Sequence, residues 1–132
     1  MVQVLADADN LMRRWMSVTM ALVAGYPCVV TVAGAPARLA RVTWPPGSTV
    51  VAAVGWQRAD LVLASAYRLN DQPLLLVTGD GDFAHLASRH PGPVAVVGVF
   101  VARALRDTAT AIDLSRDGVG PLAAWLDSRA VH

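Results

Sequence analysis

The sequence contains no lysine, no glutamate and a single cysteine. All 11 basic residues are arginine and all 10 acidic residues are aspartate, so the formal net charge is only +1. A chain so close to neutral has no long-range field of one sign, and any binding to nucleic acid must be local. Cys28 cannot form an internal disulfide, and no Cys and His residues have zinc-ligand spacing. This favours a reducing, cytoplasmic location without structural zinc.

Charged residues are also scarce, at 16%, whereas 55% of the 132 residues are hydrophobic. This composition excludes disorder, and the length predicts one domain over residues 1–132. Residues 15–37 carry no charge, but Gly-Tyr-Pro at 25–27 and Gly-Ala-Pro at 34–36 divide them, so no membrane span is expected. The first residues lack a basic segment and reach Asp7 at once, which is unlike a secretory signal.

Short apolar runs alternate along the chain with segments of helical periodicity. The runs predict strands at residues 2–6, 28–32, 49–54, 74–77, 94–99 and 111–114. The periodic segments predict helices at residues 11–22, 59–69, 83–89, 101–106 and 121–129, whereas residues 35–48 stay ambiguous. The alternation predicts an α/β three-layer sandwich, with a central, mainly parallel sheet and helices on both faces. Ligands bind such sheets beyond the carboxyl ends of the strands.

Aspartates follow the predicted strands at that edge of the sheet. Asp7 and Asp9 follow the first strand, Asp80 and Asp82 follow strand 74–77, and Asp60 opens the helix before that strand. Carboxylates about 4 Å apart repel by a few kcal/mol per pair, so a cluster needs a cation, a shared proton or an arginine. Mg²⁺ and Mn²⁺ prefer such oxygen ligands, and they serve phosphodiester hydrolysis by activating water and neutralising phosphate charge.

Three segments carry a more specific resemblance. Val-Leu-Ala-Asp-Ala-Asp-Asn-Leu at 4–11, Ala-Asp-Leu-Val-Leu at 59–63 and Leu-Val-Thr-Gly-Asp-Gly-Asp-Phe at 76–83 resemble, in order and spacing, the signature segments of NYN-domain proteins. These proteins form a branch of the PIN-like nuclease superfamily. Residues 94–99, Leu105 and 111–114 are similar to the closing pattern of that family, whereas residues 33–54 and 117–132 carry no motif.

The resemblance implies a PIN-like, Rossmann-like fold and a metal-dependent ribonuclease that hydrolyses RNA phosphodiester bonds. The residues it implies as catalytic and as Mg²⁺ or Mn²⁺ ligands are Asp7, Asp60, Asp80 and Asp82. Asn10 matches an asparagine of the family, which would steady the loop and bind substrate, and Asp9 falls at a variable position. Many members carry a further acid five residues beyond the one matched by Asp60, where this chain has Ser65. That departure leaves open the number of metals and activity itself.

Three arginines stand close to the predicted acidic site. Arg13 and Arg14 follow the first acidic loop, and Arg58 precedes Asp60, so their guanidinium groups would frame the pocket and bind RNA phosphates. The alternative is that they serve surface solubility. The hydrophobic excess also predicts an exposed apolar patch covered in a homodimer, and a protein partner or inhibitor stays open.

Plainer roles remain open for several of these residues. Asp7 and Asn10 would suit the cap of the first helix, and Asp82 would suit the cap of the helix beginning at Phe83. Asp113 is a distal site acid or a solvated strand end, and His85 is more typical of a structural or exposed position.

The alternative to a ribonuclease is a catalytically weak or inactive PIN-like module that acts in RNA binding or protein assembly. A phosphatase-like enzyme is disfavoured, because Asp-Ala-Asp at 7–9 does not continue into a D-x-D-x-T motif. A phosphate-binding loop is also disfavoured at residues 78–81, because no lysine follows.

Overall fold

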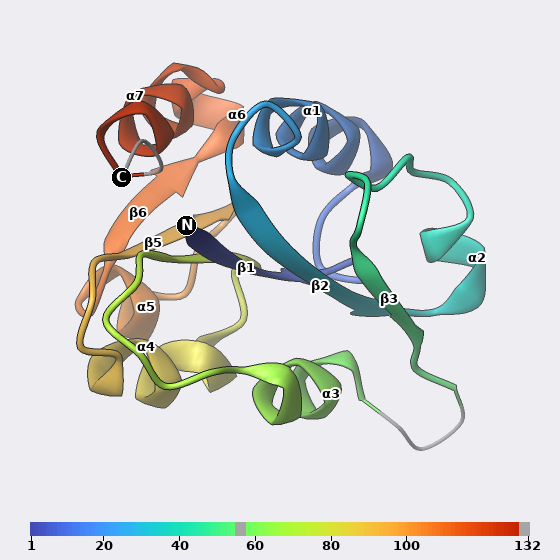
Figure 1. The fold of residues 1–132 in the computed structure, drawn as a ribbon, viewed down its shortest axis with the longest axis horizontal. Helices are drawn as coiled ribbons and strands as arrows, with labels where there is room; N and C mark the ends of the chain where they lie inside the picture. The colour runs from blue at the N-terminus through green and yellow to red at the C-terminus, as the bar shows by residue number, and fades with distance from the viewer. Residues whose placement is uncertain (55–57, 130–132) are drawn as a thin grey trace.

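The protein is described from a computed structural model, which covers residues 1–54 and 58–129. Strands and helices alternate along the chain (Figure 1). Their bounds are β1 (Val2–Asp7), α1 (Arg13–Val23), β2 (Cys28–Gly34), α2 (Pro36–Leu39), β3 (Thr49–Ala52), α3 (Ala59–Ala66), β4 (Leu74–Val77), a 3₁₀ turn η1 (Gly81–Phe83), α4 (Ala84–Arg89), β5 (Val94–Gly98), α5 (Arg103–Arg106), β6 (Thr110–Asp113), α6 (Leu114–Asp117) and α7 (Gly120–Arg129).

Six strands of the described residues form one sheet in the order β3-β2-β1-β4-β5-β6. Every neighbouring pair is parallel, so the prediction of an α/β fold with a mainly parallel sheet is confirmed. The chain builds outward from β1 through β2 to β3, and then returns to add β4, β5 and β6 on the other side. The strand order therefore reverses between β1 and β4, which are paired from Gln3–Leu74 to Ala6–Val77. In sheets of this kind, ligands bind in the crevice at such a switch point.

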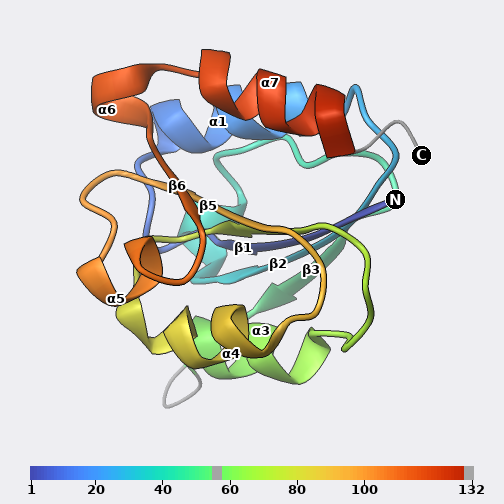
Figure 2. The same cartoon turned by 90° about the vertical axis from the view of Figure 1, so that its left-hand side faces the viewer.

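Helices cover both faces of the sheet. Figures 1 and 2 show α1, α6 and α7 on one face and α3, α4 and α5 on the other. A hydrophobic core lies on each face of the sheet, and successive strand residues point into opposite cores. Val4 packs in the core beneath α1 and α7, whereas Leu5 packs in the core formed with α3 and α4. Both side chains are at most 1% exposed. A strand buried on both faces needs a continuous apolar run, which explains why the strands lack a polar alternation.

The helix predicted at residues 59–69 is shorter in the structure, because α3 ends at Ala66. Gln3 in β1 binds the backbone of Arg68: its Oε1 accepts from the Arg68 N–H at 2.8 Å, and its Nε2 donates to the Arg68 carbonyl at 3.0 Å. These bonds hold the chain in an extended conformation beyond Tyr67, whose ψ is 136°. A partner 65 residues away thus overrides the local helical pattern.

Two short helices were not predicted, α2 within the ambiguous residues 35–48 and α6 after β6. The predicted strand 111–114 ends one residue early, because the Asp113 carboxylate accepts from the N–H groups of Ser115 and Arg116 and so caps α6. Strand β3 likewise ends at Ala52 and β5 at Gly98, short of the predicted ends at residues 54 and 99. None of the helices in the described ranges combines the length and the apolar character that a bilayer crossing requires.

Candidate functional site

Two loops meet where β1 and β4 end, at the switch point of the sheet. The Asn10 side chain, after β1, accepts a hydrogen bond from the backbone N–H of Gly79 at 2.6 Å. The buried hydroxyl of Thr78 accepts from the Asp80 N–H at 3.1 Å. The first bond holds the loop after β4 against the loop after β1, and the second fixes the backbone of Asp80 within its own loop.

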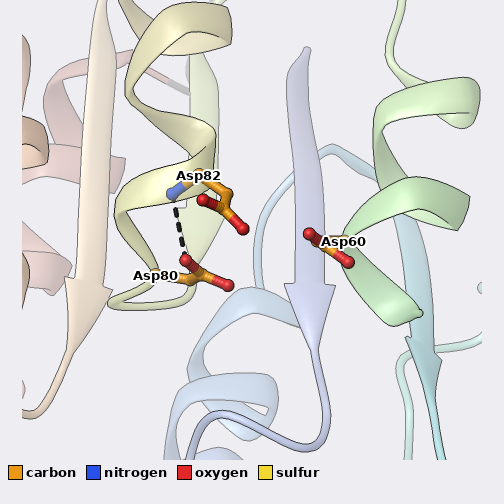
Figure 3. A group of neighbouring side chains, drawn as sticks. All are labelled: Asp60, Asp80 and Asp82. Carbon is orange, nitrogen blue, oxygen red and sulfur yellow. Dashed lines mark hydrogen bonds between the residues drawn. The ribbon is translucent and has the colours of Figure 1, made fainter.

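Three carboxylates gather beside these loops. Figure 3 shows Asp60, from the first turn of α3, facing Asp80 and Asp82 across the end of β1. One carboxylate oxygen from each of the three lies within 4.8 Å of the others. A Mg²⁺ ion, with Mg–O distances of about 2.0–2.1 Å, holds ligand oxygens up to about 4.2 Å apart. Small side-chain rotations would therefore bring the three oxygens into one coordination sphere, and this donor set fits a hard divalent cation.

Arg58 lies between two of these carboxylates. Its Nη2 is 2.7 Å from Asp60 Oδ2 and 2.9 Å from Asp82 Oδ2. The Asp60 side chain is 13% exposed, whereas those of Asp82 and Arg58 are each 61% exposed. The charge of Asp60, followed by the hydrogen bond to Asp82, raises the pKa of Arg58. One positive charge thus offsets part of the repulsion among three acids, and it sits on an exposed, movable side chain.

Asp7 lies deeper than the three clustered acids. Only 6% of its surface is exposed, and its Oδ1 accepts from the Asp9 N–H at 2.9 Å. Burial is the main reason that the pKa of Asp7 rises to about 6, and the charges of Asp9, Asp80 and Asp60 raise it further. Asp7 does not belong to the group within 4.8 Å, but it lies close enough for its charge to interact with that group.

The capping alternatives for these acids are wrong. Helix α1 begins after Met12 and has no side-chain cap, so neither Asp7 nor Asn10 caps it. Asp82 does not cap α4, because Phe83 is the residue at the N-terminal cap of that helix and no side chain bonds there. The Asp80 carboxylate accepts the Asp82 N–H at 3.0 Å and so caps η1 instead. The Asp82 side chain faces Asp60 (Figure 3), and its Oδ2 accepts from Arg58 Nη2 at 2.9 Å.

The other two arginines predicted to frame the acidic pocket lie elsewhere. The Arg14 guanidinium stacks over the Trp15 ring, 4.9 Å from its centroid. Arg13 lines a cavity of about 260 Å³ together with Arg38 and Arg41, beside Ala8 at the end of β1. Of the three predicted arginines, Arg58 alone contacts the acidic cluster.

Arg38 and Arg41 were missed by the sequence analysis. Together with Arg13 they form an arginine groove, which continues past Trp44 through a second cavity of about 350 Å³ lined by Arg13 and Arg41. Within the described ranges none of the three makes an ion pair, and no acid lines either cavity. The spacing of Arg38 and Arg41, three residues apart, was the available signal, but it lay in a segment without a motif.

The remaining candidates lie outside the cluster. Ser65 is exposed on α3, and its side chain is a hydroxyl in place of the further acid that many members of the family carry. Asp113 caps α6, and the hydrogen bond from Ser115 is the main reason that its pKa is lowered. His85 is exposed on α4, with its Nε2 3.5 Å from Arg89 Nη1. Asp9 accepts a hydrogen bond from the Ala35 N–H at 2.9 Å and so joins the β1 loop to the end of β2.

The structure therefore brings together Asp60, Asp80 and Asp82, with Asp7 behind them, at the edge where the sequence predicts a site. Comparison of the chain with family models, with curated proteins and with solved structures gives no match in any of the three.

Proposed function

We propose that this protein is a Mg²⁺- or Mn²⁺-dependent ribonuclease of the NYN branch of the PIN-like superfamily. The observation that carries the proposal is the approach of Asp60, Asp80 and Asp82 to within 4.8 Å at the switch point of a parallel sheet. These three residues and Asp7 are also the aspartates that the resemblance implies as metal ligands. The arginine groove on the other side of the same edge adds positive charge suited to a phosphate backbone.

Each residue has a distinct task in this mechanism. Asp60, Asp80 and Asp82 would hold the cation, which when bound would supply a water of lowered pKa and positive charge to neutralise the scissile phosphate. Asp7 would add a nearby negative charge, because a bound cation would favour the ionised form that burial disfavours. Asn10 keeps the Asp80 loop in place through its bond to Gly79. Arg58 is exposed enough to leave Asp82 and bind the phosphate.

A cleavage assay with a point variant tests this proposal. Labelled single-stranded RNA is incubated with the protein in Mn²⁺, in Mg²⁺ or in EDTA, beside Asp80→Asn and the control Asp71→Asn. Asp71 is an exposed residue in the turn before β4, outside the acidic cluster. We expect cleavage that requires metal, is lost at least 100-fold in Asp80→Asn and persists in Asp71→Asn. Cleavage that survives Asp80→Asn, or that continues in EDTA, would refute the assigned site.

A second candidate function is a non-catalytic RNA-binding module. The ion pairs of Arg58 with Asp60 and Asp82 favour it, because a guanidinium already occupies part of the space between these two acids. The serine at position 65 removes a further acid that many members of the family carry. Three results together would support this second function: the wild-type protein shifts RNA in a gel, it forms no cleavage product in Mn²⁺ or Mg²⁺, and it shows no saturable Mn²⁺ binding in calorimetry.

A further inference from the structure

Phe100 is an aromatic side chain that the fold leaves in solvent. Its exposed fraction is 88%, and its φ of 59° is a left-handed conformation, the one positive φ among the non-glycine residues described. Bulky residues rarely adopt this conformation, and such strain concentrates at functional sites. Neither the exposure nor the strain helps the fold, which raises the question of what the ring contacts.

The backbone ties Phe100 to the acidic cluster. The Ala102 N–H donates to the Gly79 carbonyl at 3.0 Å, so the loop after β5 is bonded to the residue that precedes Asp80. The two loops also pack closely, because a Cβ on Gly79 would lie 3.2 Å from the Phe100 carbonyl oxygen, and one on Gly81 would lie 3.3 Å from the Ala102 Cβ. The backbone of Phe100 is therefore held against the loop that carries Asp80, at the same edge of the sheet.

The surface beside Phe100 combines charged groups with the apolar side chains of Val101 and Ala111. Phe100 lines a cavity of about 230 Å³ with Arg106, Asp113 and Arg116, beyond the paired ends of β5 and β6. Arg116 forms an ion pair with Asp117 at 3.1 Å, whereas Arg106 forms none among the described residues. The cavity is smaller than the roughly 300–1,000 Å³ of sites for drug-sized ligands, which suits one flat ring or one phosphate. An exposed aromatic ring beside arginines is typical of single-stranded nucleic-acid binding.

We propose that Phe100 stacks on an unpaired base of RNA and that Arg106 contacts the adjoining phosphate, so that the site selects single-stranded over double-stranded substrate. This inference rests on the proposed function for its ligand class, RNA, but not for cleavage. A duplex keeps its bases stacked on one another, so it offers no free face to the ring.

Binding in EDTA tests the inference apart from catalysis. The probe is a short single-stranded RNA with the fluorescent base 2-aminopurine at successive positions, and the proteins are the wild type, Phe100→Ala, Phe100→Trp and Phe100→Gly. For one position of the probe we expect quenching by the wild type and by Phe100→Trp. In Phe100→Ala and Phe100→Gly we expect the quenching to disappear and the affinity to fall about 5- to 100-fold, as for the loss of one stacked base.

Three controls separate stacking from structure. Phe100→Gly removes the strained conformation, so its melting temperature should not fall although its RNA affinity does. Val18→Ala trims another exposed hydrophobic side chain, one on α1, and should bind like the wild type. A duplex of the same sequence should bind more weakly than the single strand and with equal affinity to wild type and Phe100→Ala.

The outcomes distinguish this inference from the proposed function. Unchanged affinity and quenching in Phe100→Ala, or a wild type that does not bind the single strand, overturns the inference, while the Asp80 assay still decides nuclease activity. A wild-type dimer that Phe100→Ala converts to a monomer in light scattering also overturns it, because the ring then serves a protein interface. Quenching that depends on Phe100, without cleavage in any metal, upholds the inference and refutes the nuclease.

Discussion

Burial and neighbouring negative charges both oppose ionisation of the Asp7 carboxyl group. Its side chain is enclosed at the end of β1, and the carboxylates of Asp9, Asp80 and Asp60 are near enough to add to the raised pKa. A native acid with a raised pKa binds its proton more tightly than the unfolded chain does. The folded protein therefore becomes less stable as this proton is lost.

Asp7→Asn should remove this pH dependence in the metal-free protein. The pKa of Asp7 is about 6 in the fold against 3.8 in an unperturbed chain, so the free energy of unfolding should fall by up to about 3 kcal/mol between pH 4 and pH 6. The loss is complete above about pH 6 and absent below about pH 4. Asn keeps the oxygen that accepts the Asp9 N–H, so the variant should be more stable than the wild type at pH 8.

Urea unfolding in EDTA at several pH values measures this effect. Asp71→Asn is the control and should retain the wild-type slope between pH 4 and pH 6. A wild-type stability that does not fall across this interval, or an Asp7→Asn protein that keeps the same slope, would contradict the assignment. Adding Mg²⁺ at pH 8 should stabilise the wild type more than Asp7→Asn, since the cation favours the ionised carboxylate.

At the scale of the elements, the site depends on how closely the end of β2 approaches the loop after β1. A Cβ built on Gly34 would lie 2.7 Å from the Ala8 Cβ and 3.2 Å from Asp9 Oδ1. Strand pairing fixes both backbones at this point, because Ala33 is opposite Asp7. Glycine at position 34 therefore lets the loop carrying Asn10 lie flat on the sheet edge and bond to Gly79.

Gly34→Ala should move that loop. We expect a loss of about 1–3 kcal/mol of stability, typical of overpacking, with weaker Mn²⁺ binding because the bond from Asn10 to the Asp80 loop is disturbed. Thermal unfolding and calorimetric Mn²⁺ titration measure the two effects. The matched control is Gly120→Ala at the start of α7, where an added Cβ meets nothing within 4 Å and stability should not fall. Equal behaviour of the two variants would contradict the tight approach at Gly34.

The order and type of the main elements follow from local patterns, whereas their ends do not. The apolar runs predicted the six strands to within one or two residues at each end, because the hydrophobic pattern directly reflects burial on both faces. The end of α3 and the start of α6 escaped prediction, since Gln3 and Asp113 set them through side-chain bonds to the backbone. Such bonds depend on which segments meet in space or on a cap that competes with a strand.

At the scale of the whole molecule, a net charge of +1 conceals a separation of charge along one edge of the sheet. The acidic cluster lies on the side of α3 and η1, whereas the arginine groove lies on the side of α1 and α2. Under the proposed function, the groove would bind the phosphate backbone of the RNA that is cleaved at the carboxylates. The predictions of a homodimer and of a protein partner or inhibitor stay predictions, as does the cytoplasmic location.

Arg38→Gln/Arg41→Gln should weaken RNA binding uniformly across sequences and reduce its dependence on salt. Each lost phosphate contact lowers the slope of log K against log salt by about 0.7 for single strands, so the double variant should lower it by about 1.4. The affinity is measured in EDTA between 50 and 200 mM salt. Arg129→Gln, an exposed arginine at the end of α7, is the control and should change neither quantity beyond a small amount. An unchanged slope in the double variant would exclude the groove from the RNA path.

Some residues of the candidate site could be predicted from the sequence, and others could not. Asp60, Asp80 and Asp82 were recognisable because acids after parallel strands, or at the start of the following helix, converge at one edge. Arg13 and Arg14 were predicted for the same pocket because they follow Asp9 closely, but in the structure Arg14 stacks on Trp15 and Arg13 lines a cavity with Arg38. Phe100 had no signal at all, since exposure and a positive φ are properties of the folded loop.

The sequence by itself determined the α/β class, the parallel sheet and the edge at which the aspartates gather, because burial on two faces and strand direction are encoded in local patterns. The tertiary structure alone decided which groups actually approach one another. It placed Arg58 between Asp60 and Asp82, set Asp7 behind them at a raised pKa, and joined the Phe100 loop to Gly79. Distances between side chains from distant segments depend on packing and register across the whole sheet, and no local pattern carries that information.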